Sequence, residues 1–168
     1  MRHGTPPASR DVPALYAKES GKKVRFLVAG DGELKEQLLS APQAKEFLDY
    51  RGRLNGRDAM KAFYRECDVL LVPSTAETFG LCYLEAMSQG VNVLYTKGQG
   101  FDGQFPEGAA GFHVDSSDVK DMVCRIADCI EGYAARSERC VKLSRELEWS
   151  RVTARVMDMY REVDACAF

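Results

Sequence analysis

The sequence predicts an α/β fold, in which a Rossmann-like parallel sheet carries helices on both faces. Short apolar runs alternate along the chain with segments of helical periodicity, and this alternation is typical of βαβ units. The clearest runs are VRFLVA (24–29), DVLLVP (68–73) and NVLY (92–95). Because these runs are largely apolar instead of alternating, we expect strands that are covered on both faces. A chain of 168 residues is long enough to bury a core of this kind as one domain.

The first half of the chain is expected to hold three strands and the helices between them. In order, the patterns predict a strand over 24–29, a helix from about Glu33, a strand over 48–51, a helix over 57–66 and a strand over 68–73. The first dozen or so residues are polar and rich in proline, with Pro6, Pro7 and Pro13. We therefore divide the chain into a polar lead with part of a first helix (1–20) and one domain (21–168).

The second half predicts further strands and ends in two helices. In order, we expect a helix over 79–89, a strand over 92–95, a glycine-rich loop over 98–111 that leads into a GFHV strand, and helices from about 118, 133 and 149. Gly90 follows the first of these helices as a left-handed cap, and Asp118 stands where an N-cap belongs. In the last helix Trp149 is expected to anchor packing. The apolar stripe of this helix (Val152, Val156, Met159 and Tyr160) is expected to stay uncovered and to favour self-association.

Charge, hydropathy and cysteine spacing exclude several classes of protein. Lys and Arg total 23 against 25 Asp and Glu, a formal net charge of −2 that disfavours a nucleic-acid binder. Apolar stretches stay far below the ~20 residues of a membrane span, and the N-terminus lacks the apolar core of a signal peptide. No C-x-x-C pair is present, so we expect reduced cysteines in a cytoplasmic protein and no zinc site. We expect His113 to be packed and neutral.

The first candidate phosphate loop is AGDGELKEQL, which resembles the start of a dinucleotide-binding G-x-G-x-x-G fingerprint. Lys35 replaces the third glycine, and Asp49 supplies an acidic residue only loosely at the expected distance. A nicotinamide or flavin cofactor is therefore disfavoured. A tight turn with Gly30 or Gly32 at positive φ is the simpler interpretation.

The second candidate loop, in VLLVPSTAETFGLCYLEAMSQGVNVL, is more specific. Glu77 precedes a predicted helix at the carboxyl end of a strand, and Glu85 lies about two turns inside that helix. At 1.5 Å per residue the two carboxylates would be on the order of 10 Å apart. The backbone N–H groups of Phe79, Gly80 and Leu81 would be free at the helix N-terminus. This spacing suits an extended ligand whose phosphates lie over the helix start.

This segment resembles the donor-site signature of retaining glycosyltransferases of the GT-B fold, family 4 (glycosyl transferases group 1). That signature reads P-S-x-x-E-x-F-G-L-x-x-x-E-A-M-A-x-G-x-P-V. The chain matches it at Pro73, Ser74, Glu77, Phe79, Gly80, Leu81, Glu85, Ala86, Met87, Gly90 and Val93. It departs at Ser88 and Asn92. Flanking segments agree in order, so the resemblance extends over 24–163 and implies the C-terminal half of a GT-B fold.

The resemblance implies a nucleotide diphosphate sugar as co-substrate, no metal or other cofactor, and transfer to an acceptor hydroxyl with retention. Glu77 would face the transferred sugar as the catalytic residue, and Glu85 would bind the ribose hydroxyls. The implied donor-binding residues are Glu85, Phe79, Gly80, Leu81, Gly30, Gly32 and Ser74. Synthesis of a polysaccharide or glycolipid is the implied process, with peripheral membrane contact an option for the full enzyme. The resemblance leaves the base, the sugar and the acceptor open.

Two departures leave alternatives open. The family's first donor-domain strand, G-R-L-x-x-x-K-G, has no counterpart before 24–29, so the first strand of the fold is apparently missing, and so is the acceptor-binding domain. The isolated chain is therefore expected to be inactive without an N-terminal partner. A non-catalytic nucleotide-sugar-binding module, or an inactive fragment, is the alternative function. A Rossmann NAD-binding domain is a third and less favoured one.

Overall fold

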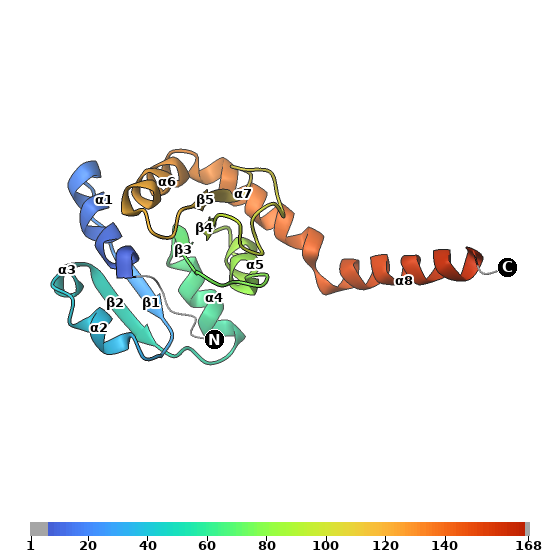
Figure 1. Cartoon of the computed structure of the whole chain (residues 1–168), viewed down its shortest axis with the longest axis horizontal. Coiled ribbons are helices and arrows are strands. Elements are labelled where there is room, and N and C mark those ends of the chain that lie inside the picture. The colour runs from blue at the N-terminus through green and yellow to red at the C-terminus, as the bar shows by residue number, and fades with distance from the viewer. Residues whose placement is uncertain (1–6, 167–168) are drawn as a thin grey trace.

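The computed structural model describes residues 7–166 and has the expected parallel α/β architecture, but its strands form two separate sheets (Figure 1). Strand β1 (Phe26–Ala29) pairs in parallel with β2 (Leu48–Gly52). Strand β4 (Asn92–Thr96) lies between β3 (Val69–Val72) and β5 (Gly111–Val114), again in parallel. The predicted fold class is confirmed, and the sheet is divided between β1 and β3.

The helices alternate with the strands as the sequence predicts. They are α1 (Val12–Ser20), α2 (Lys35–Leu39), α3 (Ala44–Phe47), α4 (Arg57–Arg65), α5 (Leu81–Ser88), α6 (Val119–Glu131), α7 (Tyr133–Ser144) and α8 (Trp149–Cys166), with short 3-10 turns at Pro7–Asp11 and Arg145–Leu147. Asp118 caps α6 by accepting hydrogen bonds from the backbone of Lys120 and Asp121. Gly90, after α5, has a φ of +82°. Both capping signals are therefore confirmed.

Strand β4 is the buried centre of the three-stranded sheet. All five of its residues are buried, and its side chains alternate between two cores. Val93 and Tyr95 belong to a core with Met87 of α5, whereas Leu94 belongs to a core with Met122 of α6. Helices therefore cover both faces of this sheet, as expected for a parallel sheet.

Strands β1 and β3 differ from the prediction, because neither is fully buried. All residues of both strands have intermediate exposure. A cavity of about 590 Å³ is lined by residues 22–27 on the β1 side and 66–71 on the β3 side, and we refer to it as the β1–β3 cleft. The apolar runs predicted strands covered on both faces, and within residues 7–166 each of these two strands pairs along one edge only.

Helix α8 also differs in part from the prediction. Trp149 is 79% exposed, so it is not a packing anchor, because α8 projects away from the body of the domain (Figure 1). The predicted uncovered stripe is found in part: Val156, Met159 and Tyr160 are exposed, whereas Val152 is half-buried. Within residues 7–166 no helix combines the length and hydropathy that a membrane crossing needs.

Arg136 of α7 is a buried cation that joins three parts of the fold. Its guanidinium donates hydrogen bonds to the carbonyl oxygens of Gly108, Asp128 and Cys129 and to Asn92 Oδ1. The guanidinium carbon also lies 4.9 Å from the ring centroid of Phe112. Asn92 stands where the glycosyltransferase signature has proline, so here the position supplies an acceptor for this network.

Replacing Arg136 with Met should lower the free energy of unfolding by about 3 kcal/mol, because buried acceptors left without a donor cost about 1–3 kcal/mol each. Urea unfolding followed by circular dichroism measures this. The matched control is Arg139→Met on the same helix, where the exposed guanidinium donates only to the Ala109 carbonyl. We expect the control to lose less than about 1 kcal/mol. Equal losses in the two variants would contradict the role of Arg136.

Candidate functional site

The loop from Pro73 to Gly80 leaves the carboxyl end of β3, the edge at which parallel sheets of this class bind ligands. Pro73 is buried, and the Ser74 N–H donates to the carbonyl oxygen of Val72 (2.8 Å). The Ser74 hydroxyl donates to the Ala76 carbonyl (3.1 Å) and accepts from the Ala76 N–H (3.4 Å). The structure therefore places Ser74 as a residue that shapes the loop.

Glu77 fixes the second half of this loop with one oxygen of its carboxylate. Glu77 Oε1 accepts from the N–H groups of Thr78 and Gly80, both at 3.0 Å. The Glu77 backbone is joined to the loop after β4, through Gln99 Oε1 (2.9 Å) and the Gly100 N–H (3.2 Å). Within the described residues Glu77 Oε2 has no hydrogen-bond partner. Glu77 is thus held in place with one oxygen available.

The two loops approach each other so closely that Gly100 has no room for a side chain. A Cβ on Gly100 would lie 1.7 Å from the carbonyl oxygen of Thr78. The loop after β4 therefore supports the loop that carries Glu77, and the glycine at position 100 is a steric requirement of this contact.

Gly80 sets the start of α5. Its φ is +77°, and a Cβ there would lie 2.3 Å from the ring of Tyr83. The Tyr83 hydroxyl in turn donates to the carbonyl oxygen of Val72 (2.8 Å), which ties α5 to the end of β3. Because the Gly80 N–H is bonded to Glu77, the expected row of three free N–H groups is reduced to two. Those of Phe79 and Leu81 make no hydrogen bond within residues 7–166.

Glu85 is exposed on α5 and is held through one oxygen. Tyr64 of α4 donates from its hydroxyl to Glu85 Oε2 (3.2 Å). Burial, with a smaller contribution from the charge of Glu85, raises the pKa of Tyr64, so this hydroxyl stays protonated as a donor. Glu85 Oε1 has no partner among the described residues. It is available to accept a hydrogen bond from a ligand.

Glu77 and Glu85 both act on the thiol of Cys82, which lies between them in sequence. Burial raises the pKa of Cys82 to about 11, and the charges of Glu77 and then Glu85 add to the effect. Glu77 lies just before α5 and Glu85 within it, so both are positioned by the start of this helix. The structure thus brings together the two residues that the sequence singled out.

The glycine turn after β1 belongs to the other sheet. Gly30 has a φ of +131°, and its N–H donates to the Gly52 carbonyl (2.7 Å), so this N–H is not free for a phosphate. Its carbonyl accepts from the Tyr50 hydroxyl (2.7 Å). Gly32 is exposed, with no positive φ. The expected tight turn is found, with Gly30 as its strained position.

The sequence did not predict the cluster formed by Asp102, Glu107 and His113. His113 Nδ1 lies 3.2 Å from Glu107 Oε2 and 3.7 Å from Asp102 Oδ1. His113 therefore has two carboxylate neighbours, which the prediction of a packed residue did not include. The three potential ligand atoms lie within 4.8 Å of one another, a separation that could hold a metal ion. Tyr95 and the backbone of Gly98 and His113 also donate to these carboxylates. Nothing in the spacing of the two acidic residues signalled this contact.

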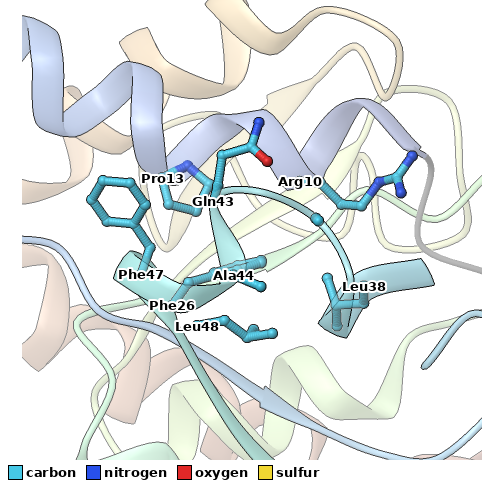
Figure 2. A pocket seen from close by; sticks show the side chains of 9 residues that line it. Arg10, Pro13, Phe26, Leu38, Gln43, Ala44, Phe47 and Leu48 are labelled. Atoms are coloured by element: carbon cyan, nitrogen blue, oxygen red, sulfur yellow. The ribbon is translucent and has the colours of Figure 1, made fainter. Parts of the chain in front are cut away.

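A second, much smaller cavity lies at the start of β1 and β2, where Phe26 and Leu48 line it together with Gln43 (Figure 2). Its volume is about 10 Å³, which is room for one water molecule. It lies at the amino ends of these strands, away from Glu77 and Glu85. It is therefore no candidate for a nucleotide site.

Comparison with known proteins identifies one family. The family model described as glycosyl transferases group 1 matches residues 11–147. D-inositol 3-phosphate glycosyltransferase of Saccharomonospora viridis is 33% identical over 172 residues, covering 93% of this chain and 39% of that protein. Sulfoquinovosyl transferase SQD2 of Arabidopsis thaliana is 30% identical over 145 residues, covering 80% of this chain and 27% of that protein. The chain thus spans well under half of these relatives.

A solved structure agrees with the fold. Anabaena HepE in complex with UDP superposes with a TM-score of 0.73 at 18% identity, covering 94% of this chain and 46% of that protein. At this identity the likeness concerns the fold alone.

The contact between Gly80 and Tyr83 predicts a steric cost that a matched variant can isolate. Gly98 has a φ of +73°, close to that of Gly80, but a Cβ there meets nothing within 4 Å. Gly98→Ala and Gly80→Ala should each lower the free energy of unfolding by about 1–2 kcal/mol, because alanine is strained in the left-handed conformation. Gly80→Ala should lose about 1–3 kcal/mol more, because Tyr83 is 1% exposed and cannot move aside. Urea unfolding curves measure both, and equal losses would contradict the close contact.

Proposed function

The chain belongs to the glycosyl transferases group 1 family, and on this premise we propose that it is the donor-binding half of a retaining glycosyltransferase of family 4. It would bind a nucleotide diphosphate sugar, whose sugar is transferred to an acceptor hydroxyl. Support comes from the relatives named as glycosyltransferases and from HepE, which has been solved with UDP and with UDP-glucose. We place the activity in the cytoplasm, in the synthesis of a polysaccharide or glycolipid.

The observation that carries this proposal is the state of Glu85. Its carboxylate is exposed, oriented by the buried Tyr64 through Oε2, and unpartnered at Oε1 within the described chain. A carboxylate accepts hydrogen bonds without donating any, so it is suited to the two hydroxyls of a ribose. Hydrogen bonds to a charged group are worth about 1.5–3 kcal/mol each. Glu85 is therefore assigned to the ribose.

The diphosphate is assigned to the start of α5. The free N–H groups of Phe79 and Leu81 lie there, and the positive end of a helix dipole favours an anion. Lys97, exposed directly after β4, is the nearest cation in sequence to the loop that supports Glu77. We assign it a phosphate contact.

Glu77 is assigned to the transferred sugar. Its Oε1 holds the loop, and its Oε2 is left for a sugar hydroxyl or for the charge that develops at the anomeric carbon. Departure of the nucleoside diphosphate leaves an oxocarbenium-like centre, and groups held rigidly beforehand stabilise such charge most effectively. The bonds from Thr78 and Gly80 supply this rigidity.

A non-catalytic nucleotide-sugar-binding module is the second candidate. The division of the strands into two sheets favours it, because Gly30 and Gly32 follow β1 of one sheet, whereas Glu77 and Glu85 follow β3 of the other. Phosphate contacts from both sheets require a fixed distance between them. Transfer measured with a nucleotide sugar and an acceptor, in the presence of an acceptor-binding domain, separates the two candidates.

Glu85→Gln should weaken binding of a nucleoside diphosphate by about tenfold or more, the loss of one charge-assisted hydrogen bond at 1.4 kcal/mol per decade. Calorimetric titration with UDP, GDP and ADP first identifies the preferred base. The control is Glu138→Gln on α7, an exposed glutamate without a hydrogen bond or ion pair in residues 7–166, which should leave affinity unchanged. Unchanged affinity in folded Glu85→Gln would remove Glu85 from the site, and no binding of any of the three nucleotides to the wild type would contradict the proposal.

Removal of divalent cations with EDTA should leave nucleoside diphosphate affinity unchanged, because we assign the diphosphate to N–H groups and a cation. The same titrations, run with and without EDTA, measure this. A strict requirement for Mg²⁺ or Mn²⁺ would contradict the assignment. Loss of that requirement in His113→Ala would then trace it to the cluster of Asp102, Glu107 and His113.

A further inference from the structure

The cluster of Asp102, Glu107 and His113 joins the loop after β4 to the strand that follows it. Asp102 and Glu107 lie in the loop between β4 and β5, and His113 lies within β5, where it pairs with Tyr95 of β4. The side chains of Asp102, Glu107 and His113 are 24%, 43% and 32% exposed, so a dissolved ion can reach them. None of the three residues is assigned to the donor site.

The separations within the cluster match those between the ligands of one metal ion. His113 Nδ1 lies 3.2 Å from Glu107 Oε2 and 3.7 Å from Asp102 Oδ1, and all three atoms lie within 4.8 Å of one another. Around a tetrahedral zinc ion, with ligands at about 2.0–2.1 Å, neighbouring ligand atoms are about 3.3 Å apart. Both separations from Nδ1 are close to this value. One ion can therefore contact all three atoms after small movements of the side chains.

Backbone N–H groups hold one oxygen of each carboxylate and leave the other oxygen beside His113. The Gly98 N–H donates to Asp102 Oδ2 (2.7 Å), and the His113 N–H donates to Glu107 Oε1 (3.2 Å). The oxygens near the imidazole are the other two, Asp102 Oδ1 and Glu107 Oε2. Hydrogen bonds of this kind orient carboxylates that bind metal ions. The two oxygens beside His113 are thus positioned by the backbone.

Tyr95 connects the cluster to the buried aromatic core. Its hydroxyl donates to Glu107 Oε2 (3.2 Å), and burial raises the pKa of Tyr95, so the hydroxyl stays protonated as a donor. The side chain is 4% exposed, and its ring packs against Tyr83 and Phe101, with centroids 6.2 and 5.1 Å away. Glu107 is therefore oriented by a residue that cannot move freely, and a site built on it is organised before an ion arrives.

The imidazole of His113 is close to both carboxylates without being their hydrogen-bond donor. In the part of the chain that the structure describes, the donors to Asp102 and Glu107 are Tyr95 and two backbone N–H groups. Two carboxylates and a neutral imidazole suit a divalent cation, because their two negative charges balance it. One nitrogen among the ligands favours Zn²⁺, since Mg²⁺ and Ca²⁺ take oxygen ligands. This set of ligands contains no cysteine, so the cysteine spacing could not indicate it.

We propose that Asp102, Glu107 and His113 bind one zinc ion through Oδ1, Oε2 and Nδ1, and that water completes a tetrahedral shell. The ion ties the loop after β4 to β5 and stabilises the loop that supports Glu77. It does not contact the diphosphate. The zinc site is independent of the proposed function, because its three ligands have no assigned contact with the nucleotide sugar.

The test uses the full chain, freed of metal with a chelator and titrated with zinc sulfate by calorimetry. We expect saturable binding of one ion, a rise in Tm with zinc, and a much weaker response to magnesium sulfate. His113→Gln should weaken zinc binding by about tenfold or more. The matched control is His3→Gln, at the other of the chain's two histidines, which should leave zinc affinity unchanged. Long-range ¹H–¹⁵N NMR should show zinc on Nδ1 of His113.

Asp102→Asn keeps an acceptor for the Gly98 N–H but removes the charge, so it should fold and also bind zinc at least about tenfold more weakly. It keeps the test decisive if His113→Gln does not fold. Unchanged affinity in these variants, as expected if cysteines held the zinc, would overturn the site. So would the absence of saturable binding, which would leave His113 as an ion-pair partner of the two carboxylates. A nucleoside diphosphate affinity that requires zinc would overturn the stabilising role.

Discussion

Burial of β4 on both faces and both edges is the constraint on which the candidate site depends. Its pairing with β3 fixes the end of β3 at Val72. Its pairing with β5 brings the backbone of Gly111 so close that a Cβ on Gly111 would lie 1.7 Å from the Val93 carbonyl oxygen. The loop that follows β4 then supports Glu77 through Gln99 and Gly100. The position of Glu77 therefore depends on β4, through the loop that follows β4 and the loop that follows β3.

Local patterns in the sequence predicted what local physics decides. The five strands, the capping of α6 by Asp118 and the left-handed Gly90 all follow from periodicity and from residues adjacent in the chain. The same patterns failed for contacts between distant residues. Arg136 reaches back 44 residues to Asn92, and His113 meets carboxylates of the preceding loop. The burial of β1 and β3 was overestimated for the same reason. An apolar run indicates that a strand needs apolar surroundings, but whether other segments cover that strand depends on distant parts of the chain.

The residues of the candidate site are held by two different sheets. Glu77, Gly80 and Glu85 are tied to the three-stranded sheet by Tyr83 and Tyr64, which pack in one aromatic core with Tyr95 and Phe101. Gly30 and its turn are tied to β2 through Gly52 and Tyr50. In the part of the chain that the structure describes, the chain connections, the apolar packing between the sheets and the exposed pairs of Glu66 relate one group to the other. Exposed ion pairs contribute little to stability, so the distance between the two groups rests mainly on the apolar packing of Leu27 and Ala29 against the core of the three-stranded sheet.

The projection of α8 has a hydrodynamic consequence. Its 18 residues make a rod of about 27 Å that Figure 1 shows leading away from the domain. Such an appendage adds little mass but much friction, so the monomer diffuses and sediments more slowly than a sphere of equal mass. In gel filtration it would elute early and resemble a larger species. Light scattering, which measures mass independently of shape, is therefore the appropriate readout of its assembly state.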